Sequence, residues 1–261
     1  MLPFTFDFTN AKPSIKYISD EEYANYCPYN IPKLDEIIKL IDSATYAVDK
    51  STFISDVFEC GALSISNLVD KTQYDAREEQ YKKVITKYAK REQILMTEVF
   101  AKIFALLSSV VYDNGAFNDY LGQLFMQCNM GNKNSGQFFT PYHISEFMAR
   151  VVISEQKQTL LQKKNEIITI NDPCCGGGGM MLAVLDVLKN TYKINYARHC
   201  FIECSDIDIR CVYMTYLQLS LAGVPAIVYH RNTLTMETWS AWKTPAFVFQ
   251  YLRFAKYEQR R

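Results

Sequence analysis

The sequence has no excess of charge of either sign, because basic and acidic residues number 28 each in a chain of 261 residues. A dedicated nucleic-acid-binding protein usually carries a basic excess, so this composition argues against tight binding to DNA by the chain alone. No uninterrupted run approaches the ~20 apolar residues of a membrane span. The first residues, MLPFTF, lack the basic and apolar regions of a secretory signal. We therefore expect a cytoplasmic protein with no membrane partner.

Cysteine pairs with the spacing of metal ligands are also missing. The sequence contains eight cysteines but no C-x-x-C pair. A zinc site built on His199, Cys200 and Cys204 has no such spacing to support it, and we expect no metal. The scattered cysteines lie in apolar stretches, which predicts buried free thiols in a reducing cytosol.

Glycine is scarce, with ten residues in all, yet four of them are consecutive at Gly176–Gly179. They follow a β-branched run at 167–170 and precede an apolar stretch at 181–188, which predicts a strand, a glycine turn and a helix. Such a turn at the carboxyl end of a strand is where open α/β sheets bind ligands. Met181 and Leu182 would occupy the small-residue position of a dinucleotide fingerprint, which disfavours that ligand, and no P-loop is present.

The segment at 171–180, NDPCCGGGGM, resembles motif I (D-P-x-x-G-x-G-G) of S-adenosylmethionine-dependent DNA adenine N6-methyltransferases. The similarity is greatest to the modification subunits of type I restriction–modification systems. Further segments match this family in the expected order. Before motif I, NDYLGQLF at 118–125 is similar to a D-x-L-G-x-x-Y/F lead-in, and GQFFTP at 136–141 is similar to G-Q-F-[FY]-T-P. After motif I, DID at 206–208 with the following helix is similar to the E-x-D element, and RNTL at 231–234 is similar to G-D-T-L. The resemblance covers roughly residues 115–235.

The periodicity of apolar residues predicts helices first and an α/β alternation afterwards. The expected helices of the first part are 33–50, 75–112 and 117–128, and the apolar second half of 75–112 is expected to be buried. The second part is expected to contain helix 142–154, strand 166–171, helix 179–190, strand 199–205, helix 208–222 and strand 225–230. This β-α-β-α-β order predicts parallel strands with right-handed crossovers.

The expected fold class is α/β, with a Rossmann-like methyltransferase core that has an incomplete sheet and is preceded by an α-helical domain. The loop at 131–136, GNKNSG, is the clearest candidate boundary. We therefore divide the chain into a helical domain at 1–130 and a Rossmann-like S-adenosylmethionine-binding domain at 131–261.

The resemblance implies S-adenosylmethionine as the cofactor and implies a site built from the motif residues. These residues are Gln137, Phe138, Phe139, Thr140, Pro141, Asp172, Pro173, Cys174, Gly176, Gly178, Asp206, Ile207 and Asn232.

Individual roles follow from the family pattern and from side-chain chemistry. Asp172 is expected near the methionine end of the cofactor, where a carboxylate also offsets the sulfonium charge. Asp206 is expected to hold the ribose hydroxyls, because a carboxylate offers only acceptors to a diol. Asp208 is the alternative for that role, although it fits a helix N-cap better. Asn232 either accepts a hydrogen bond from the adenine amino group or shapes a turn. Thr140 is expected to cap the helix that follows it, with Pro141 in its first turn.

The catalytic tetrapeptide of the family, [DN]-P-P-[FYW], is missing from the sequence. The nearest segment is Thr244–Pro245–Ala246–Phe247, where Thr replaces the amide or carboxylate acceptor. The preceding residues 236–243 show no buried-strand pattern, whereas 247–251 are expected to form a strand. The tetrapeptide would then lie at the amino end of that strand, away from the site. Thr244, Pro245 and Phe247 are therefore weak catalytic candidates.

Three functions remain open. The leading hypothesis is an S-adenosylmethionine-binding protein of the DNA adenine N6-methyltransferase family, which methylates adenine in DNA if it is active. The alternative is a catalytically degenerate or split subunit that binds the cofactor or a partner and transfers no methyl group alone. A small-molecule methyltransferase is the third, and GQFFTP argues against it. Expected partners are DNA, bound weakly by the chain alone, and a subunit that supplies the missing catalytic or target-recognition parts.

Overall fold

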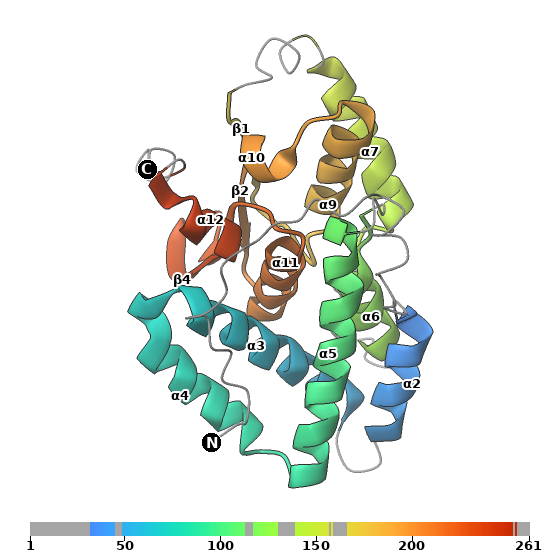
Figure 1. Ribbon diagram of the computed structural model, residues 1–261, viewed down its shortest axis with the longest axis vertical. Coiled ribbons are helices and arrows are strands. Elements are labelled where there is room, and N and C mark those ends of the chain that lie inside the picture. Colours follow the sequence, from blue (N-terminus) through green and yellow to red (C-terminus); the bar gives the residue numbers. More distant parts are fainter. Residues whose placement is uncertain are drawn as a thin grey trace, which may run out of the picture. The chain divides into compact units, whose positions relative to one another are not determined.

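A four-stranded sheet and the helices packed on it organise the part of the chain that the computed structural model describes, which is residues 32–44, 49–112, 117–129, 139–156, 158, 166–252 and 254 (Figure 1). The strands are β1 (Ile168–Asp172), β2 (Cys200–Asp206), β3 (Ala226–Asn232) and β4 (Glu237–Lys243). They lie in the order β1-β2-β3-β4. The fold class is therefore mixed α/β, with a high helical content.

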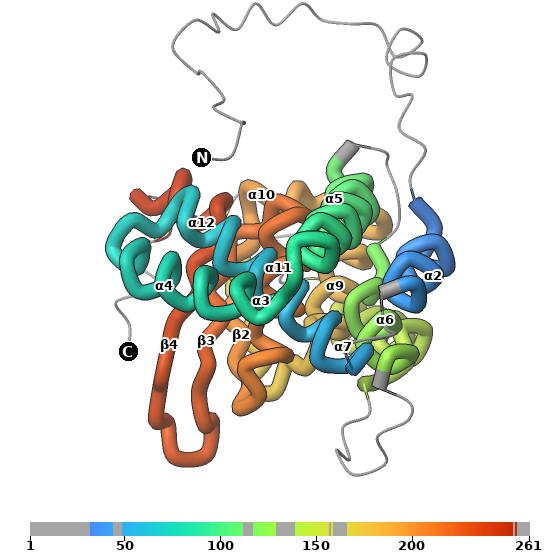
Figure 2. The backbone as a smooth tube through the Cα atoms, turned by 90° about the horizontal axis from the view of Figure 1, so that it is seen from below, coloured from blue at the N-terminus to red at the C-terminus, as the bar shows by residue number. Residues whose placement is uncertain are grey.

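The first three strands are parallel, as the β-α-β-α-β alternation predicts, and β4 runs antiparallel to β3. Figure 2 shows β3 and β4 running side by side to the hairpin that joins them. The expectation that residues 236–243 form no strand was wrong, although they show no buried-strand pattern: β4 lies at the edge of the sheet, and Trp242 is its one buried residue, packed against Tyr213 and Tyr216 of a neighbouring helix. The expected strand at 247–251 is instead the short helix α12 (Pro245–Phe249).

The helices that precede the sheet are α2 (Leu34–Ala44), α3 (Lys50–Val69), the 3-10 turn η2 (Lys71–Gln73), α4 (Tyr74–Ile85), α5 (Lys90–Tyr112), α6 (Tyr120–Asn129) and α7 (Tyr142–Glu155). Those between the strands are α9 (Gly179–Asp186), the π-helical turn η3 (Val187–Thr191), α10 (Tyr196–His199) and α11 (Ile209–Leu221).

The helix expected at 33–50 ends early, and α3 follows it as an element that the periodicity does not reveal. Asp49 caps α3 by accepting a hydrogen bond from the Thr52 N–H at 2.9 Å. More than half of the residues of α3 are buried, so apolar side chains occur on most sides of this helix. The difference in hydrophobicity between its faces is therefore small, and the sequence shows no clear helical period.

The long helix expected at 75–112 is divided into α4 and α5. Tyr88, between them, is buried and donates a hydrogen bond from its hydroxyl to Asp56 of α3 at 2.8 Å. Glu92 accepts from the Ala89 N–H at the start of α5. The long-range contact of Tyr88 with Asp56 and the local cap by Glu92 therefore separate α4 from α5, although one helical pattern of apolar residues runs through both.

Helix α5 is long and apolar enough to span a membrane by length and composition, although only 33% of that stretch is buried. Core helices of soluble proteins meet the same criterion, and α5 packs on α2, α3 and α11. Its second half is buried on one side only, since Phe104 and Val111 are exposed. The expectation that this half is fully buried was therefore wrong.

One apolar core joins the helices to one face of the sheet. It contains residues of α2, α3, α5, α6, α9 and α11 together with alternate strand residues such as Ile202 and Val228. The opposite face carries a smaller cluster of Phe201, Ile227, Phe247 and Phe254. Residues 32–261 form a compact unit of their own, so the division at residue 130 stays a prediction.

Candidate functional site

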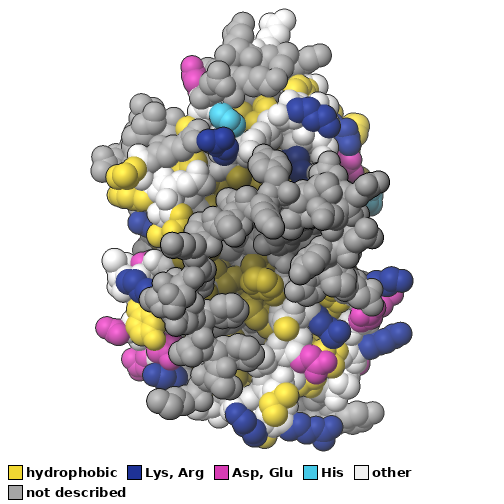
Figure 3. Space-filling model, viewed as in Figure 1, with side chains coloured by type: hydrophobic (Ala, Val, Ile, Leu, Met, Phe, Trp, Pro, Cys, Tyr) yellow, Lys and Arg dark blue, Asp and Glu magenta, His cyan; other side chains and the backbone are white. Residues whose placement is uncertain are grey.

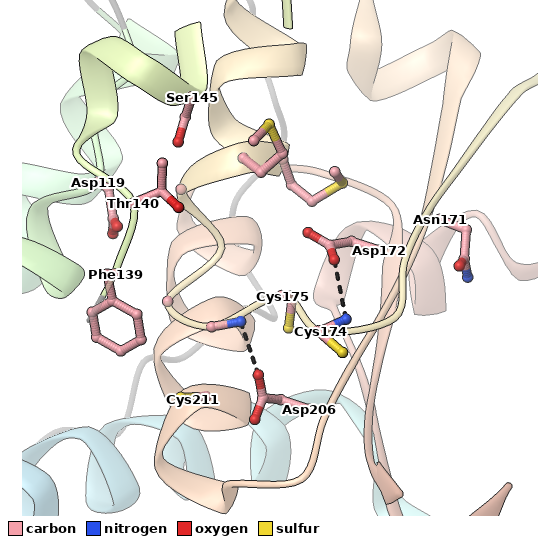
Figure 4. A pocket seen from close by; sticks show the side chains of 15 residues that line it. Asp119, Phe139, Thr140, Ser145, Asn171, Asp172, Cys174, Cys175, Asp206 and Cys211 are labelled. Atoms are coloured by element: carbon pink, nitrogen blue, oxygen red, sulfur yellow. Dashed lines mark hydrogen bonds between the residues drawn. The ribbon is translucent and has the colours of Figure 1, made fainter. Parts of the chain in front are cut away.

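A cavity of about 580 Å³ lies at the carboxyl ends of β1 and β2, beside the glycine turn (Figure 4). This is the position that open parallel sheets favour for ligands, and the volume suits a small-molecule cofactor. The residues that line it are Asp119, Phe139, Thr140, Ser145, Asn171, Asp172, Cys174, Cys175, Gly176, Gly177, Gly179, Met180, Met181, Asp206 and Cys211.

Asp206, the last residue of β2, connects the strand to the glycine turn. Its Oδ2 accepts a hydrogen bond from the Gly176 N–H at 2.9 Å, and its Oδ1 accepts from the Asp208 N–H at 2.9 Å. Each carboxylate oxygen can accept more than one hydrogen bond, so both remain able to bind a ligand hydroxyl. Asp208 instead caps α11 through the Arg210 N–H and pairs with the Arg210 guanidinium at 2.5 Å.

Asp172, the last residue of β1, lies on the cavity wall near Asp206. Its Oδ1 accepts from the Cys174 N–H at 3.1 Å. Burial raises the pKa of Asp172 above its ordinary value, the nearby Asp206 carboxylate adds to the rise, and the Cys174 N–H opposes it. The ionised form is therefore disfavoured in the cavity unless a positive group approaches it.

Three of the four glycines of the turn are required by the backbone conformation or by contacts within the protein, whereas a Cβ on Gly177 would meet only ordinary contacts. Gly176 and Gly178 have positive φ angles of 53° and 91°, where other residues are strained. A Cβ on Gly178 would lie 3.0 Å from the Thr215 hydroxyl, and one on Gly179 would lie 2.8 Å from Asp119. The close approach seen in the structure is made by atoms of the protein itself, and the expected approach of a ligand to this backbone stays a prediction.

Asp119 holds the turn from the helical part of the chain. It precedes α6, and its Oδ1 accepts from the Gly122 N–H at 2.9 Å and from Gln218 Nε2 at 2.8 Å. The same Gln218 nitrogen donates to the Gly177 carbonyl at 2.6 Å. Burial raises the pKa of Asp119, while these two hydrogen bonds to it act in the opposite direction.

Two residues of the GQFFTP segment line the cavity, namely Phe139 and Thr140. Phe139 packs against the Gly176 position and against Phe125, with 5.4 Å between ring centroids. Pro141, rather than Thr140, is the N-cap of α7, so the expected helix start is displaced by one residue. Gln137 and Phe138 lie outside the described residues.

Other predicted residues surround the cavity without lining it. The Pro173 carbonyl accepts from the hydroxyls of Ser205 and Thr233, which fixes the turn. Ile207 is 62% exposed beside Asp206. The Asn232 side-chain oxygen accepts from the N–H groups of Leu234 and Thr235, which favours the turn-shaping alternative.

The weak catalytic candidates lie at the opposite end of the sheet. Thr244 is fully buried and caps α12; its hydroxyl donates to the Val224 carbonyl at 2.6 Å and accepts from the Ala226 N–H at 2.9 Å. Phe247 fills the smaller apolar cluster. Both positions adjoin the start of β3, because the tetrapeptide follows the end of the antiparallel strand β4 and not because it precedes a strand at 247–251, as was expected.

Several cavity residues were not among the predicted site residues. Asp119 lines it from the residues that precede α6, Ser145 from α7 and Cys211 from α11. Every described cysteine except Cys174 is buried, and all are free thiols. No cluster of three His, Cys, Asp or Glu side chains suited to a metal ion occurs in the described parts of the chain.

The charge of the cavity is of one sign. Asp119, Asp172 and Asp206 line it, and none of its described lining residues is a lysine or an arginine. A site for phosphate groups ordinarily supplies basic side chains or a phosphate-binding loop. Three carboxylates instead favour a ligand that carries positive charge and hydroxyl donors.

Comparison with known proteins identifies one family. The family described as N-6 DNA Methylase matches residues 115–257. No curated protein matches the chain. Among solved structures, a type I restriction-modification system methyltransferase subunit from Streptococcus thermophilus is similar, with a TM-score of 0.40 and 16% identity over 84% of this chain. The match spans 47% of that subunit, so the chain corresponds to about half of its length.

Proposed function

Because the chain belongs to the N-6 DNA methylase family, whose model matches more than half of it, we propose that the cavity beside the glycine turn binds S-adenosylmethionine. The fold is then a Rossmann-like methyltransferase core preceded by a helical domain that ends near residue 130. The single observation that carries this proposal is the acidic lining of the cavity, formed by Asp119, Asp172 and Asp206.

Charge distinguishes this cofactor from the other nucleotides that bind at glycine turns. S-adenosylmethionine carries a sulfonium and an ammonium group against one carboxylate, whereas NAD and ATP carry phosphates. Phosphates would meet three carboxylates in a partly desolvated cavity, where like charges repel more strongly than in water. Asp206 would hold the ribose hydroxyls, and Asp172 would lie nearer the sulfonium, whose positive charge favours the ionised form of that acid.

Calorimetry tests this assignment. The protein is titrated with S-adenosylmethionine, S-adenosylhomocysteine, NAD and ATP. We expect binding of the first two alone, and we expect Asp206→Ala to weaken it by about tenfold or more, because a hydrogen bond to a charged group is lost. Asp208→Asn is the matched control and should change affinity by less than about twofold. Absence of binding, or an Asp206→Ala variant that binds as the parent does, would refute the assignment.

The position of Thr244 and Phe247 favours the second function, a degenerate or split subunit. Methyl transfer to adenine needs an acceptor for the target amino group and an aromatic face for the extruded base. These two side chains are buried at the amino end of the sheet and cannot reach a base at the cavity. We therefore propose that the isolated chain binds the cofactor and that a partner subunit supplies the missing acceptor.

Incorporation of tritiated methyl groups into mixed-sequence DNA tests this second proposal. The purified chain should give no incorporation above background. Robust turnover would show that another residue set performs the chemistry, and Thr244→Ala would then decide whether the buried threonine contributes.

DNA binding by the chain alone is proposed to be weak and sensitive to salt. Acidic and basic side chains are interspersed among the described residues of the face in Figure 3, and the charges balance over the whole chain. Affinity for duplex DNA grows with the number of phosphates that are neutralised. Tight sequence-specific binding at physiological salt in a mobility-shift assay would contradict this.

A further inference from the structure

The peptide group between Pro173 and Cys174 is held from both sides. Its carbonyl oxygen accepts from the Thr233 hydroxyl at 2.6 Å and from the Ser205 hydroxyl at 3.1 Å. Its N–H group, which belongs to Cys174, donates to Asp172 Oδ1 at 3.1 Å (Figure 4). A peptide group is planar, and this one is trans, so its carbonyl and its N–H point in opposite directions. A contact that fixes the carbonyl therefore also fixes the N–H group that holds Asp172.

The guanidinium group of Arg231, near the carboxyl end of β3, lies behind the two hydroxyls. Its Nη2 donates to Ser205 Oγ at 3.2 Å, and the hydroxyl oxygens of Ser205 and Thr233 are 3.2 Å apart. A guanidinium has no acceptor, so Ser205 Oγ accepts from it and has its single proton for Thr233 or the Pro173 carbonyl. The hydrogen bonds therefore all run in one direction, from the guanidinium to the peptide group. We call this series of groups (Arg231, Ser205, Thr233 and the peptide group after Pro173) the donor chain.

The donor chain begins on the face of the sheet opposite the helices α9 and α11. Ser205 alternates with Phe201 of the smaller apolar cluster along β2, which places both on that face. Ser205 is fully buried and Arg231 is 4% exposed, with Glu203 at 3.7 Å from the guanidinium. Arg231 Nε makes no hydrogen bond to a described residue. Burying a cation in this way destabilises the protein, and a link that only shaped the turn would not need a charge.

A charge at the start of the donor chain strengthens each hydrogen bond along it. Donors in a series polarise one another, and a carbonyl that accepts two hydrogen bonds makes the N–H of its own peptide group a stronger donor. The acceptor of that N–H is Asp172. Burial and the nearby Asp206 carboxylate raise the pKa of Asp172, and the Cys174 N–H opposes them. The strength and direction of this one N–H therefore decide how readily Asp172 ionises.

The other groups around Asp172 cannot replace this N–H. None of the described residues that line the cavity is basic. The titratable groups that face Asp172 or share its cavity all become negative when they ionise, so they disfavour its carboxylate. They are Asp206 and Cys204 of β2, Cys174 of the turn, Cys211 of α11 and Asp119, which precedes α6.

We propose that Arg231, Ser205 and Thr233 are positioning residues, which act on the cavity from the opposite face of the sheet by holding the peptide group after Pro173 and, through it, the Asp172 carboxylate. The value of this for a cationic ligand rests on the proposed function, whereas the hold on Asp172 depends on no ligand. The family pattern G-D-T-L has glycine where this sequence has Arg231, so the donor chain belongs to this protein and not to the motif.

An NMR titration of the chain labelled with ¹³C at its aspartate carboxyl carbons measures the pKa of Asp172, and Asp172→Asn identifies its signal. Thr233→Val keeps the shape of the side chain and removes the hydroxyl, and Thr233→Ser restores it. Ser205→Ala separates Arg231 from the peptide group, and it carries the test if Thr233→Val folds poorly. Calorimetry at a series of pH values gives the affinity of each variant for S-adenosylmethionine.

The matched control is Thr235→Val, in the same hairpin. The Thr235 hydroxyl accepts from the Glu237 N–H at 3.4 Å and takes no part in the donor chain. Its loss weakens the hairpin in the way that a merely structural role of Thr233 would, so the control separates a less stable turn from an altered carboxylate.

We expect Thr233→Val and Ser205→Ala to raise the pKa of Asp172 above that of the parent, because the N–H that favours its ionised form is weakened. The pH at which the affinity reaches half its plateau should rise with it, and below that pH the affinity should fall about threefold to tenfold. Thr233→Ser and Thr235→Val should behave as the parent does.

An unchanged pKa of Asp172 in Thr233→Val or Ser205→Ala would overturn the inference, and so would an equal rise in Thr235→Val. A parent chain that binds no S-adenosylmethionine would refute the proposed function alone, because the carboxyl titration needs no ligand and would still decide whether the donor chain controls Asp172.

Discussion

Two Thr-Pro pairs begin helices in this protein, one at each end of the sheet, and they differ in every functional respect. Thr140 and Pro141 precede α7 at the carboxyl end, where Thr140 is exposed and lines the cavity. Thr244 and Pro245 precede α12 at the amino end, where Thr244 is fully buried and its hydroxyl makes three contacts with the backbone near β3. Similar residues therefore line a cavity in one place and belong to the core in the other.

The aromatic residues beside these pairs differ in the same way. Phe139 is partly buried on the cavity wall, against the glycine turn. Phe247 is fully buried, with its ring 5.6 Å from that of Phe201. A short motif thus acquires its role from the end of the strand at which it lies, because ligands collect at the carboxyl ends of parallel strands.

Truncation of the two aromatic side chains should separate stability from binding, with the largest effect at the amino end. Phe247→Ala should lower the free energy of unfolding by about 3–5 kcal/mol, because it leaves a cavity among buried rings. Phe139→Ala should cost about 1–2 kcal/mol in stability but weaken S-adenosylhomocysteine binding several-fold. Urea denaturation and calorimetry measure the two effects. A Phe247→Ala variant that folds normally and loses the ligand would reverse the comparison.

Two glycines with positive φ angles, Gly178 and Gly223, allow a matched comparison in which a smaller loss of stability is expected. Gly178→Ala should lower the free energy of unfolding by about 1–3 kcal/mol and weaken ligand binding, because the new methyl group approaches Thr215 in a strained conformation. Gly223, at φ 69°, has nothing within 4 Å of an added Cβ. Gly223→Ala should therefore cost about 1 kcal/mol and leave the affinity unchanged. Equal losses of affinity in thermal-shift titrations would contradict this.

The aspartates at the carboxyl ends of β1 and β2 predict that stability and ligand affinity depend modestly on pH. Asp172 has a folded-state pKa above its ordinary value of 3.8, so the free protein should lose stability as pH rises from that value through the raised pKa. Affinity for S-adenosylmethionine should rise over the same range, as the carboxylate ionises, and then level off. Asp172→Asn should flatten both profiles. An affinity that falls with pH between 4 and 7, or one unaffected by Asp172→Asn, would be inconsistent with a cationic ligand at this acid.

The parts that the sequence predicts well are those encoded by neighbouring residues. The glycine turn, the parallel strands β1, β2 and β3, and the position of Asp206 follow from local composition and from the order of motifs. The prediction that Asp208 is the N-cap of α11 is confirmed. It also depends on neighbouring residues, because the N–H group that Asp208 accepts from belongs to Arg210, two residues away.

The parts that it misses depend on distant partners. Asp119 lies 99 residues from Gln218, which orients it, and nothing in the local sequence reveals that contact. Tyr88 divides α4 from α5 through Asp56, 32 residues earlier. Ser145 lies in an ordinary helical stretch, and the lack of a hydrogen bond between its hydroxyl and any described residue is visible only in three dimensions. The lead-in at residues 118–125 was the one local signal that could have pointed to Asp119.

A crystal structure of the chain with S-adenosylhomocysteine would test the assignment of the two ends of the sheet most directly. The ligand is expected at the carboxyl ends of β1 and β2, with its ribose hydroxyls on Asp206. Thr244 and Phe247 are expected to remain buried and without ligand contact. A ligand bound at the amino end of the sheet, or one that does not contact Asp206, would contradict the site proposed for this protein.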